Sequence, residues 1–102
     1  MSYEMIRHYV IEMLLDRGEP MEKTKIGIIY DHSLHEVHLT YDFKTIEYVF
    51  TVDFNPFRDI LSRLSRDFDV RYMKRAEGKD YYTLIPKKTL VEKIRKGKLL
   101  FI

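Results

Sequence analysis

Cysteine, tryptophan and glutamine are absent from the sequence, and asparagine and alanine occur once each, at Asn55 and Ala76. Without cysteine the chain has no disulfide, no thiol nucleophile and no thiolate ligand, so a zinc site would need histidine and carboxylate ligands. No apolar run approaches the roughly 18 residues of a membrane span, because charged residues interrupt the hydrophobic stretches. We therefore expect a cytoplasmic chain with no signal peptide, no structural disulfide and no membrane partner.

The composition is that of a globular protein with a high content of charged residues. Its 102 residues are 45% hydrophobic and 33% charged, which is enough for one domain, residues 1–102, with a modest core. Abundant charges of both signs combined with scarce amide side chains are typical of proteins from hyperthermophiles. The composition thus predicts a single globular domain adapted to high temperature.

Apolar spacing predicts one helix followed by three strands in the first half of the chain. Residues 3–17 carry the apolar stripe of an amphipathic helix, and Ser2 is placed to cap its N-terminus. Residues 25–31 and 36–42 alternate as the two strands of a hairpin. The β-branched and aromatic residues of 46–52 predict a third strand.

The second half repeats the order of helix and hairpin. Asn55 and Pro56 predict the cap and the first position of a second amphipathic helix. Residues 70–75 and 80–85 alternate again, and Gly78 between them can supply the positive φ that a tight turn needs. The sequence therefore predicts a second hairpin after the second helix.

The C-terminal residues predict a short helix and an apolar tail. Thr89 and Glu92 have the spacing of a capping box, and Gly97 would stop the helix that follows them. Residues 99–102 are all apolar. We expect this tail to form either a last strand or a contact.

These elements predict an α+β fold of two tandem helix-plus-hairpin units, residues 1–52 and 53–102, packed around one core. An ungapped alignment of residues 25–49 with residues 69–93 pairs the apolar positions of the two hairpins. This suggests an internal duplication in which the two units are related by an approximate two-fold axis. The alternative, that any two such units look alike at this level, stays open. One helix on one hairpin buries too little apolar surface to be stable, so the units should share a core in either case.

Three closely spaced histidines, His32, His35 and His38, raise the question of a metal site. Side-chain direction alternates along a strand, so His35 and His38 would point to opposite faces, and their spacing does not match the helical His-Glu-x-x-His motif. Only His32 and His35 could readily converge near the turn, which gives a weak site even with a neighbouring carboxylate. We expect no bound metal and no cofactor.

The sequence also has none of the motifs that indicate catalysis. It contains no glycine-rich phosphate loop and no nucleophile elbow, and its serines lie in cap, turn or helix contexts without an evident partner base. Its carboxylates are interleaved with Lys and Arg, as on a solvated surface. We therefore predict that the protein is not an enzyme.

Charge is divided unevenly along the chain. Residues 1–50 contain 5 Lys and Arg against 9 Asp and Glu, whereas residues 51–102 contain 13 against 7, which gives net charges of −4 and +6. The basic second half favours an acidic partner, and weak nucleic-acid binding by a winged-helix-like helix and hairpin is the alternative function. The strand predicted just before Asn55 argues against it, because a helix-turn-helix needs a helix there.

Aromatic residues concentrate where the two predicted units join. Six of the 14 aromatic residues fall within residues 41–57. A sheet with this small number of strands must also have edges whose backbone groups are unpaired. We therefore predict a protein–protein interaction module that takes an extended peptide by strand addition in the groove between the units. The rival outcomes are a homodimer formed through the same edge and an edge filled by the apolar tail. The expected contact residues are Tyr41, Phe43, Tyr48, Phe50, Tyr72, Tyr82, Lys74 and Arg75.

Several of these features together resemble one group of proteins. They are the helix–hairpin order, the lack of cysteine, the lone asparagine and alanine, and the aromatic run Tyr41, Phe43, Tyr48 and Phe50. In composition and length the chain resembles the small orphan proteins of filamentous viruses that infect hyperthermophilic archaea. No site motif accompanies the resemblance, so no functional residue is carried over. It implies a viral protein that acts in the cytoplasm of an archaeal host cell.

Overall fold

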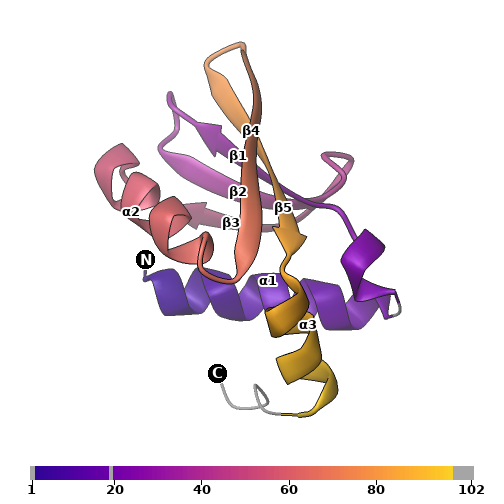
Figure 1. Cartoon of the computed structure of the whole chain (residues 1–102). Helices are drawn as coiled ribbons and strands as arrows, with labels where there is room; N and C mark the ends of the chain where they lie inside the picture. The colour runs from indigo at the N-terminus through magenta and orange to yellow at the C-terminus, as the bar shows by residue number, and fades with distance from the viewer. Residues whose placement is uncertain (1, 19, 98–102) are drawn as a thin grey trace.

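The structure is a computed structural model that describes residues 2–18 and 20–97, coloured along the chain in Figure 1. The predicted α+β class is confirmed. The apolar tail at residues 99–102 lies outside the described residues. In chain order the elements are α1 (Tyr3–Arg17), η1 (Met21–Lys23), β1 (Ile26–Asp31), β2 (Glu36–Tyr41), β3 (Thr45–Thr51), α2 (Phe54–Leu64), β4 (Phe68–Ala76), β5 (Lys79–Pro86) and α3 (Lys88–Arg95).

The five strands form one antiparallel sheet in the order β3-β2-β1-β5-β4. β1 and β5 pair along all of β1, from Ile26 opposite Leu84 to Asp31 opposite Lys79. The first strand of the chain therefore lies in the middle of the sheet, and all six of its residues are buried. β3 and β4 are left as the two edges.

The predicted duplication is not confirmed, and the strand order shows why. In the proposed alignment β1 corresponds to β4 and β2 corresponds to β5. β1 is a central strand whereas β4 is an edge strand, so no two-fold axis can exchange both pairs of strands. β3 also has no counterpart in the second half. The two hairpins are thus similar in pattern but occupy non-equivalent places.

Helices α1 and α2 pack on the same face of the sheet. The rings of Tyr30 and Tyr82 contact Phe57 of α2, and Tyr48 on the same face contacts Tyr9 of α1. A single cluster of buried side chains includes residues of α1, the sheet, α2 and α3. Burying each large apolar side chain contributes about 1.5–3 kcal/mol, so both halves of the chain depend on this shared core.

The first helix begins and ends where the sequence predicts. Ser2 Oγ accepts a hydrogen bond from the backbone N–H of Met5 at 3.3 Å, which caps the N-terminus of α1. Gly18 follows the helix with a φ of 74°, and its N–H donates to the carbonyl oxygen of Leu15. Local sequence signals were sufficient here because each cap is made within one helical turn.

The predicted starts of the other two helices are wrong. α2 begins at Phe54 after Asp53, so Pro56 lies within the first turn rather than at its first position. Proline fits either place, because the first N–H groups of a helix have no intrahelical partner. α3 begins at Lys88, directly after β5, so Thr89 lies inside the helix instead of capping it.

Phe43 covers part of the opposite face of the sheet. It belongs to the turn between β2 and β3, has a φ of 61°, and turns its ring towards Gly27 and edge-on to Tyr81, with ring centroids 5.7 Å apart. A Cβ atom at Gly27 would lie 2.6 Å from this ring and 2.6 Å from Thr40 Oγ1. The close approach of turn and strand therefore requires glycine at this position.

Replacing Gly27 with alanine should lower the free energy of unfolding by about 1–3 kcal/mol, because the added methyl group overpacks the contact with Phe43. Chemical denaturation measures the loss. In a Phe43→Ala background, the same substitution should lower the free energy of unfolding by clearly less than it does in the natural chain, because the effects of substitutions that share a contact are not additive. Equal costs in the two backgrounds would contradict the contact.

The turn between β1 and β2 is organised by Asp31. Its Oδ1 atom accepts hydrogen bonds from Ser33 Oγ at 2.8 Å, Ser33 N at 2.9 Å and Leu34 N at 3.1 Å. The hydroxyl of Ser33 contributes most to lowering the pKa of the Asp31 carboxyl below its usual value, and the backbone N–H of Leu34 contributes next. The turn is thus stabilised by a negative charge.

Replacing Asp31 with asparagine keeps an acceptor and removes this charge. Because the pKa of Asp31 is lowered in the folded state, its contribution is fully present above the ordinary aspartate range and is lost as the pH falls through the folded-state pKa. Asp31→Asn should therefore lower the free energy of unfolding at neutral pH and have a vanishing effect in strong acid. Denaturation curves of the natural chain and the variant, measured from neutral pH to strong acid, test this prediction. A stability difference between the two proteins that does not change with pH would contradict it.

Candidate functional site

Rings from both halves of the chain form a connected network beside α2. Its members are Tyr30, His32, Phe54, Phe57, Tyr72 and Tyr82. Neighbouring ring centroids lie 4.5 to 5.8 Å apart, within the range of favourable aromatic contacts. Tyr30 and Phe57 are buried beneath the other four rings. We call those four, His32, Phe54, Tyr72 and Tyr82, the aromatic patch.

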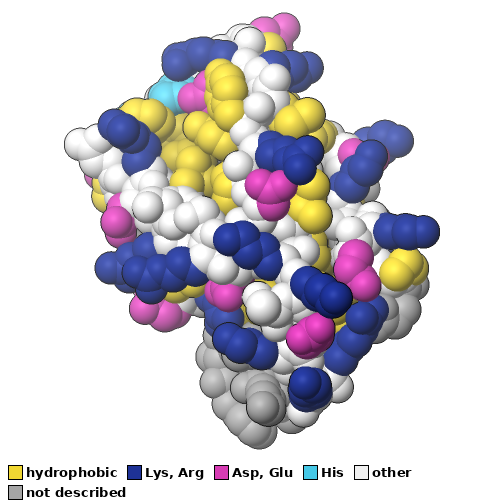
Figure 2. All heavy atoms as spheres, viewed as in Figure 1, with side chains coloured by type: hydrophobic (Ala, Val, Ile, Leu, Met, Phe, Trp, Pro, Cys, Tyr) yellow, Lys and Arg dark blue, Asp and Glu magenta, His cyan; other side chains and the backbone are white. Residues whose placement is uncertain are grey.

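The aromatic patch is open to solvent and bordered by cations. Tyr72 is 56% exposed and Phe54 is 37% exposed, although both are large apolar rings. Figure 2 shows apolar side chains gathered in a hollow between α2 and the β4–β5 hairpin, with Lys and Arg side chains around it. The guanidinium carbon of Arg58 lies 5.9 Å from the centre of the Phe54 ring. Contiguous apolar area with a polar rim is typical of a binding surface.

A buried carboxylate holds the patch together. Asp80 is 5% exposed, and its Oδ2 atom lies 2.6 Å from Nε2 of His32. Its Oδ1 atom accepts a hydrogen bond from the hydroxyl of Tyr72 at 3.1 Å, and Arg75 Nη1 approaches Oδ2 at 3.9 Å. Asp80 therefore fixes side chains from the β1–β2 turn and from β4 relative to β5.

The two tyrosines of the patch remain uncharged donors. Loss of contact with water raises the pKa of the Tyr72 hydroxyl, and its hydrogen bond to Asp80 raises it further. Loss of contact with water also raises the pKa of Tyr82, and the negative charge of Asp80 is the next largest cause. Both hydroxyls are neutral at physiological pH, so the exposed rim of the patch offers O–H groups and ring faces but no negative charge.

The structure brings together three of the eight predicted contact residues. Tyr72 and Tyr82 lie side by side in the patch with centroids 5.3 Å apart, and Arg75 stands at its border beside Asp80. Lys74 points to the opposite face of the sheet, where its Nζ atom lies 5.0 Å from the centre of the Tyr81 ring.

The other four predicted residues lie elsewhere. Phe43 also contacts Tyr81 on the opposite face. Tyr41 and Phe50 are each only 9% exposed and belong to the core, and Tyr48 is half-buried against them. The eight residues therefore do not form one surface, because α1 packs over the aromatic side chains of β2 and β3 and buries them against the core.

Each of the three closely spaced histidines has a different carboxylate partner. His32 pairs with Asp80, His35 lies 3.3 Å from Asp53, and His38 lies 3.0 Å from Glu36. Within residues 2–18 and 20–97, no three His, Cys, Asp or Glu side chains are grouped so that they could hold a metal ion.

Sequence reasoning missed three members of this site, namely His32, Phe54 and Asp80. Phe54 lies within the aromatic-rich stretch 41–57 and could have been selected from it. The roles of His32 and Asp80 depend on β1 pairing with β5, which places Asp80 opposite Tyr30. No local pattern in the sequence specifies that pairing.

The two sheet edges differ in charge and shape. β3 exposes Ile46 and Val49, by 53% and 49%, and contains a single charged residue. β4 carries Arg71, Lys74 and Arg75 in an exposed stretch, and a bulge interrupts its pairing with β5. Cations on an edge strand oppose pairing with an identical edge, whereas an acidic strand would be attracted.

Comparison of the chain with protein-family models, with curated proteins and with solved structures finds no match. None of the helices formed by the described residues has the length and apolar character needed to cross a membrane.

Replacing Asp80 with alanine should lower the free energy of unfolding by about 1–3 kcal/mol, because His32 and the Tyr72 hydroxyl lose their partner. Asp69→Ala is the matched control, since Asp69 is a more exposed aspartate of the same hairpin that pairs only with Arg71. Its effect should stay within about 0.5 kcal/mol. Chemical denaturation of both variants measures the two free energies of unfolding. Equal losses of stability in the two variants would contradict the anchoring role of Asp80.

Proposed function

We propose that the protein is a non-enzymatic binding module that adds an extended, acidic segment of a partner protein to the free edge of β4. One observation carries the proposal: β4 is an edge strand that combines exposed backbone, cationic side chains and a neighbouring patch of exposed rings. β3, the other edge, has exposed apolar side chains but contains no Lys or Arg.

Strand addition would use the backbone of β4 for affinity. Residues 71–75 are all exposed, and an edge strand presents unpaired N–H and C=O groups to solvent. In an added strand every second side chain would point to the face that carries Tyr72. The hollow between α2 and the β4–β5 hairpin would receive these side chains, so apolar or aromatic residues at alternate positions are the expected preference.

Charge supports an acidic partner. Among the described residues, Arg58 and Lys74 form no ion pair with a carboxylate, and Arg75 reaches Asp80 only at 3.9 Å. Their positive charge is therefore largely available to a ligand. Such charges raise the association rate and select the partner more than they add affinity.

The His32–Asp80 pair resembles the histidine–carboxylate pairs of hydrolases, and its surroundings favour binding instead. The hydroxyl of Ser33, the next residue in the chain, donates its hydrogen bond to Asp31 Oδ1 at 2.8 Å, and the hydroxyl of Tyr72 donates to Asp80 Oδ1. His32 is packed between the rings of Tyr30 and Phe54, with centroids 4.9 Å from each. We therefore assign the pair to positioning the patch rather than to proton transfer.

Single-stranded nucleic acid is the second candidate ligand, favoured by the position of Arg58 over Phe54. Bases stack on aromatic rings while cations contact phosphates, and such binding weakens steeply with salt. The winged-helix version of this hypothesis has less support, because residues 45–51 before α2 form β3. An origin in an archaeal virus, with action inside the host cell, stays a proposal that rests on composition.

A random peptide library displayed against the pure protein should yield acidic sequences with alternating apolar residues. Tyr72→Ala should weaken the selected peptides by about tenfold or more, as expected for an aromatic anchor. Met73→Ala is the matched control, because Met73 is also 56% exposed and is the next residue in β4. Its effect on affinity should be small.

A titration with a single-stranded oligonucleotide at physiological salt runs in parallel. Tight binding there, with no peptide selected, would replace the proposed ligand by nucleic acid. Equal effects of Tyr72→Ala and Met73→Ala on peptide affinity would reject the aromatic patch as the binding surface. A concentration-dependent dimer lost on charge insertion in β3, without peptide binding, would indicate self-association instead.

A further inference from the structure

A hollow of about 530 Å³ opens at the corner where α1 ends, and it shares no lining residue with the aromatic patch. Its walls come from the end of α1, η1 and the segment that leads into β1, and from the turn between β2 and β3. Four cations line it, Arg17, Lys23, Lys25 and Lys44, together with one carboxylate among the described residues, Asp42. We call this hollow the basic pocket.

The concentration of cations in the basic pocket is unexpected for this half of the chain. Residues 1–50 have a net charge of −4 and contain only five Lys and Arg. Four of the five line this pocket, and the fifth, Arg7, is paired with Asp67 at 2.9 Å. Unlike Arg7, none of the four forms an ion pair with any described carboxylate. Their mutual repulsion is a cost that an anionic ligand would remove.

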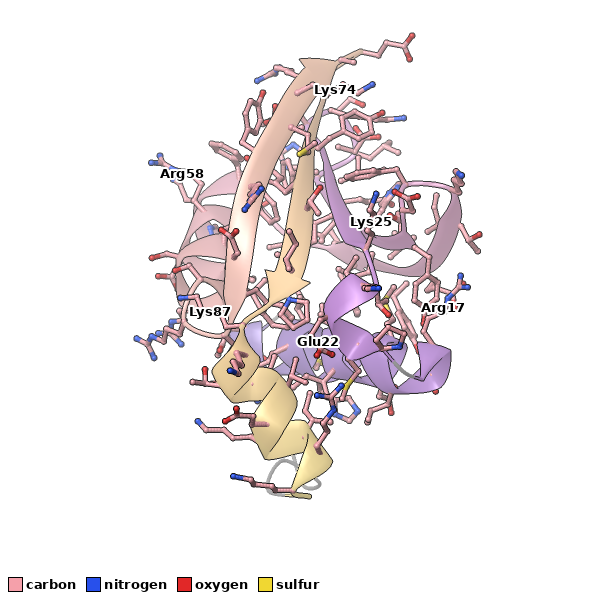
Figure 3. The ribbon with its side chains drawn as sticks, turned by 45° about the vertical axis from the view of Figure 1, so that its right-hand side comes forward. Arg17, Glu22, Lys25, Arg58, Lys74 and Lys87 are labelled. Carbon is pink, nitrogen blue, oxygen red and sulfur yellow. The ribbon has the colours of Figure 1, made fainter. Side chains whose placement is uncertain are left out.

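Two walls of the pocket are fixed before any ligand arrives. The guanidinium of Arg17 lies 4.0 Å above the ring of Tyr41, and the Tyr41 hydroxyl donates a hydrogen bond to the carbonyl oxygen of Met13 at 2.7 Å. The ring holds the guanidinium in one orientation, and a guanidinium has five N–H donors, so several can still reach an anion. Figure 3 shows Arg17 and Lys25 on the same side of the molecule, one from α1 and one from the segment that leads into β1.

The turn between β2 and β3 fixes the other wall. Asp42 and Phe43 both have positive φ, 51° and 61°, and the N–H of Lys44 donates to the carbonyl oxygen of Tyr41 at 2.9 Å. The N–H of Asp42 donates to the carbonyl oxygen of Lys25, also at 2.9 Å. Lys25 and Lys44 are thus carried by backbone segments that are hydrogen-bonded to each other, which lowers the entropy lost on binding.

We propose that the basic pocket binds a compact anion with two or more phosphate groups, either a nucleoside polyphosphate or an inorganic oligophosphate. The described lining residues carry a formal charge of +3, from four cations and one carboxylate. Each terminal phosphate carries about −1.5 to −2 charges at neutral pH, so two groups match this charge where one does not. The volume lies within the range of ligand pockets, about 300–1,000 Å³.

The site is independent of the proposed peptide site. None of its lining residues belongs to α2, β4 or β5, which carry most of the aromatic patch. Its ligand is recognised by charge and hydrogen bonds, with the hydroxyl groups of Thr24 and Thr45 as further donors, rather than by apolar contact. Failure of either proposal leaves the other untouched.

Calorimetric titration of the full chain with sodium tripolyphosphate at low salt tests the proposal. Binding should be one to one, should weaken with added salt, and should shift the backbone amide signals of residues 17–25 and 41–45 in NMR spectra. The double variant Lys25→Gln with Lys44→Gln should lose about tenfold or more in affinity, because each lysine supplies a charge-assisted hydrogen bond. Both lysines are exposed, so the variant should keep its fold.

Lys93→Gln, an exposed lysine of α3 outside the pocket, is the control and should change the affinity by less than about twofold. Titrations with ATP and with monophosphate distinguish the ligand sources. Tighter binding of ATP than of tripolyphosphate would assign a nucleotide, and equal binding would assign an oligophosphate. Unshifted amide signals at residues 17–25 and 41–45, monophosphate binding as tightly as tripolyphosphate, or equal losses in the control and the double variant would overturn the proposal.

Discussion

The pairing of β1 with β5 is the interaction on which the rest of the structure depends. It joins strands that are about fifty residues apart in the chain, from Ile26 opposite Leu84 to Asp31 opposite Lys79. It makes one sheet from two hairpins, leaves β3 and β4 as edges, and lets helices from both halves share a core. It also places Asp80 opposite Tyr30, so that one carboxylate can hold His32 and Tyr72. The aromatic patch therefore exists only because this pairing forms.

Local features of the structure could be predicted from the sequence, and its long-range pairing could not. The cap at Ser2, the stripe of α1 and the alternation of the strands are set within a few residues. Pro56 fits several positions of a first helical turn, so it did not fix the start of α2. The choice of β5 as the neighbour of β1 is decided by core packing across the whole chain, which similar hairpin patterns cannot encode. For this reason the aromatic residues Tyr41 and Phe50 were expected at a surface and lie in the core.

The distribution of charge gives the two halves of the molecule different surfaces. In the second half, cations accompany an open strand edge and exposed rings, an arrangement suited to an extended acidic segment. In the acidic first half, nearly all cations gather at one hollow with fixed walls, an arrangement suited to a small phosphate-bearing ligand. Both surfaces leave positive charge without an internal carboxylate partner, although Arg71 of β4 is paired with Asp69.

The central claim is that β4 is the edge to which a partner strand adds. Amide hydrogen exchange of the protein with a selected acidic peptide, compared with the free protein, tests it most directly. Slower exchange is expected for amides of β4 within residues 70–76, because an added strand would hydrogen-bond to their free edge, and little change is expected in β3. Slower exchange confined to residues 45–51 of β3, or only on the helices, would contradict it.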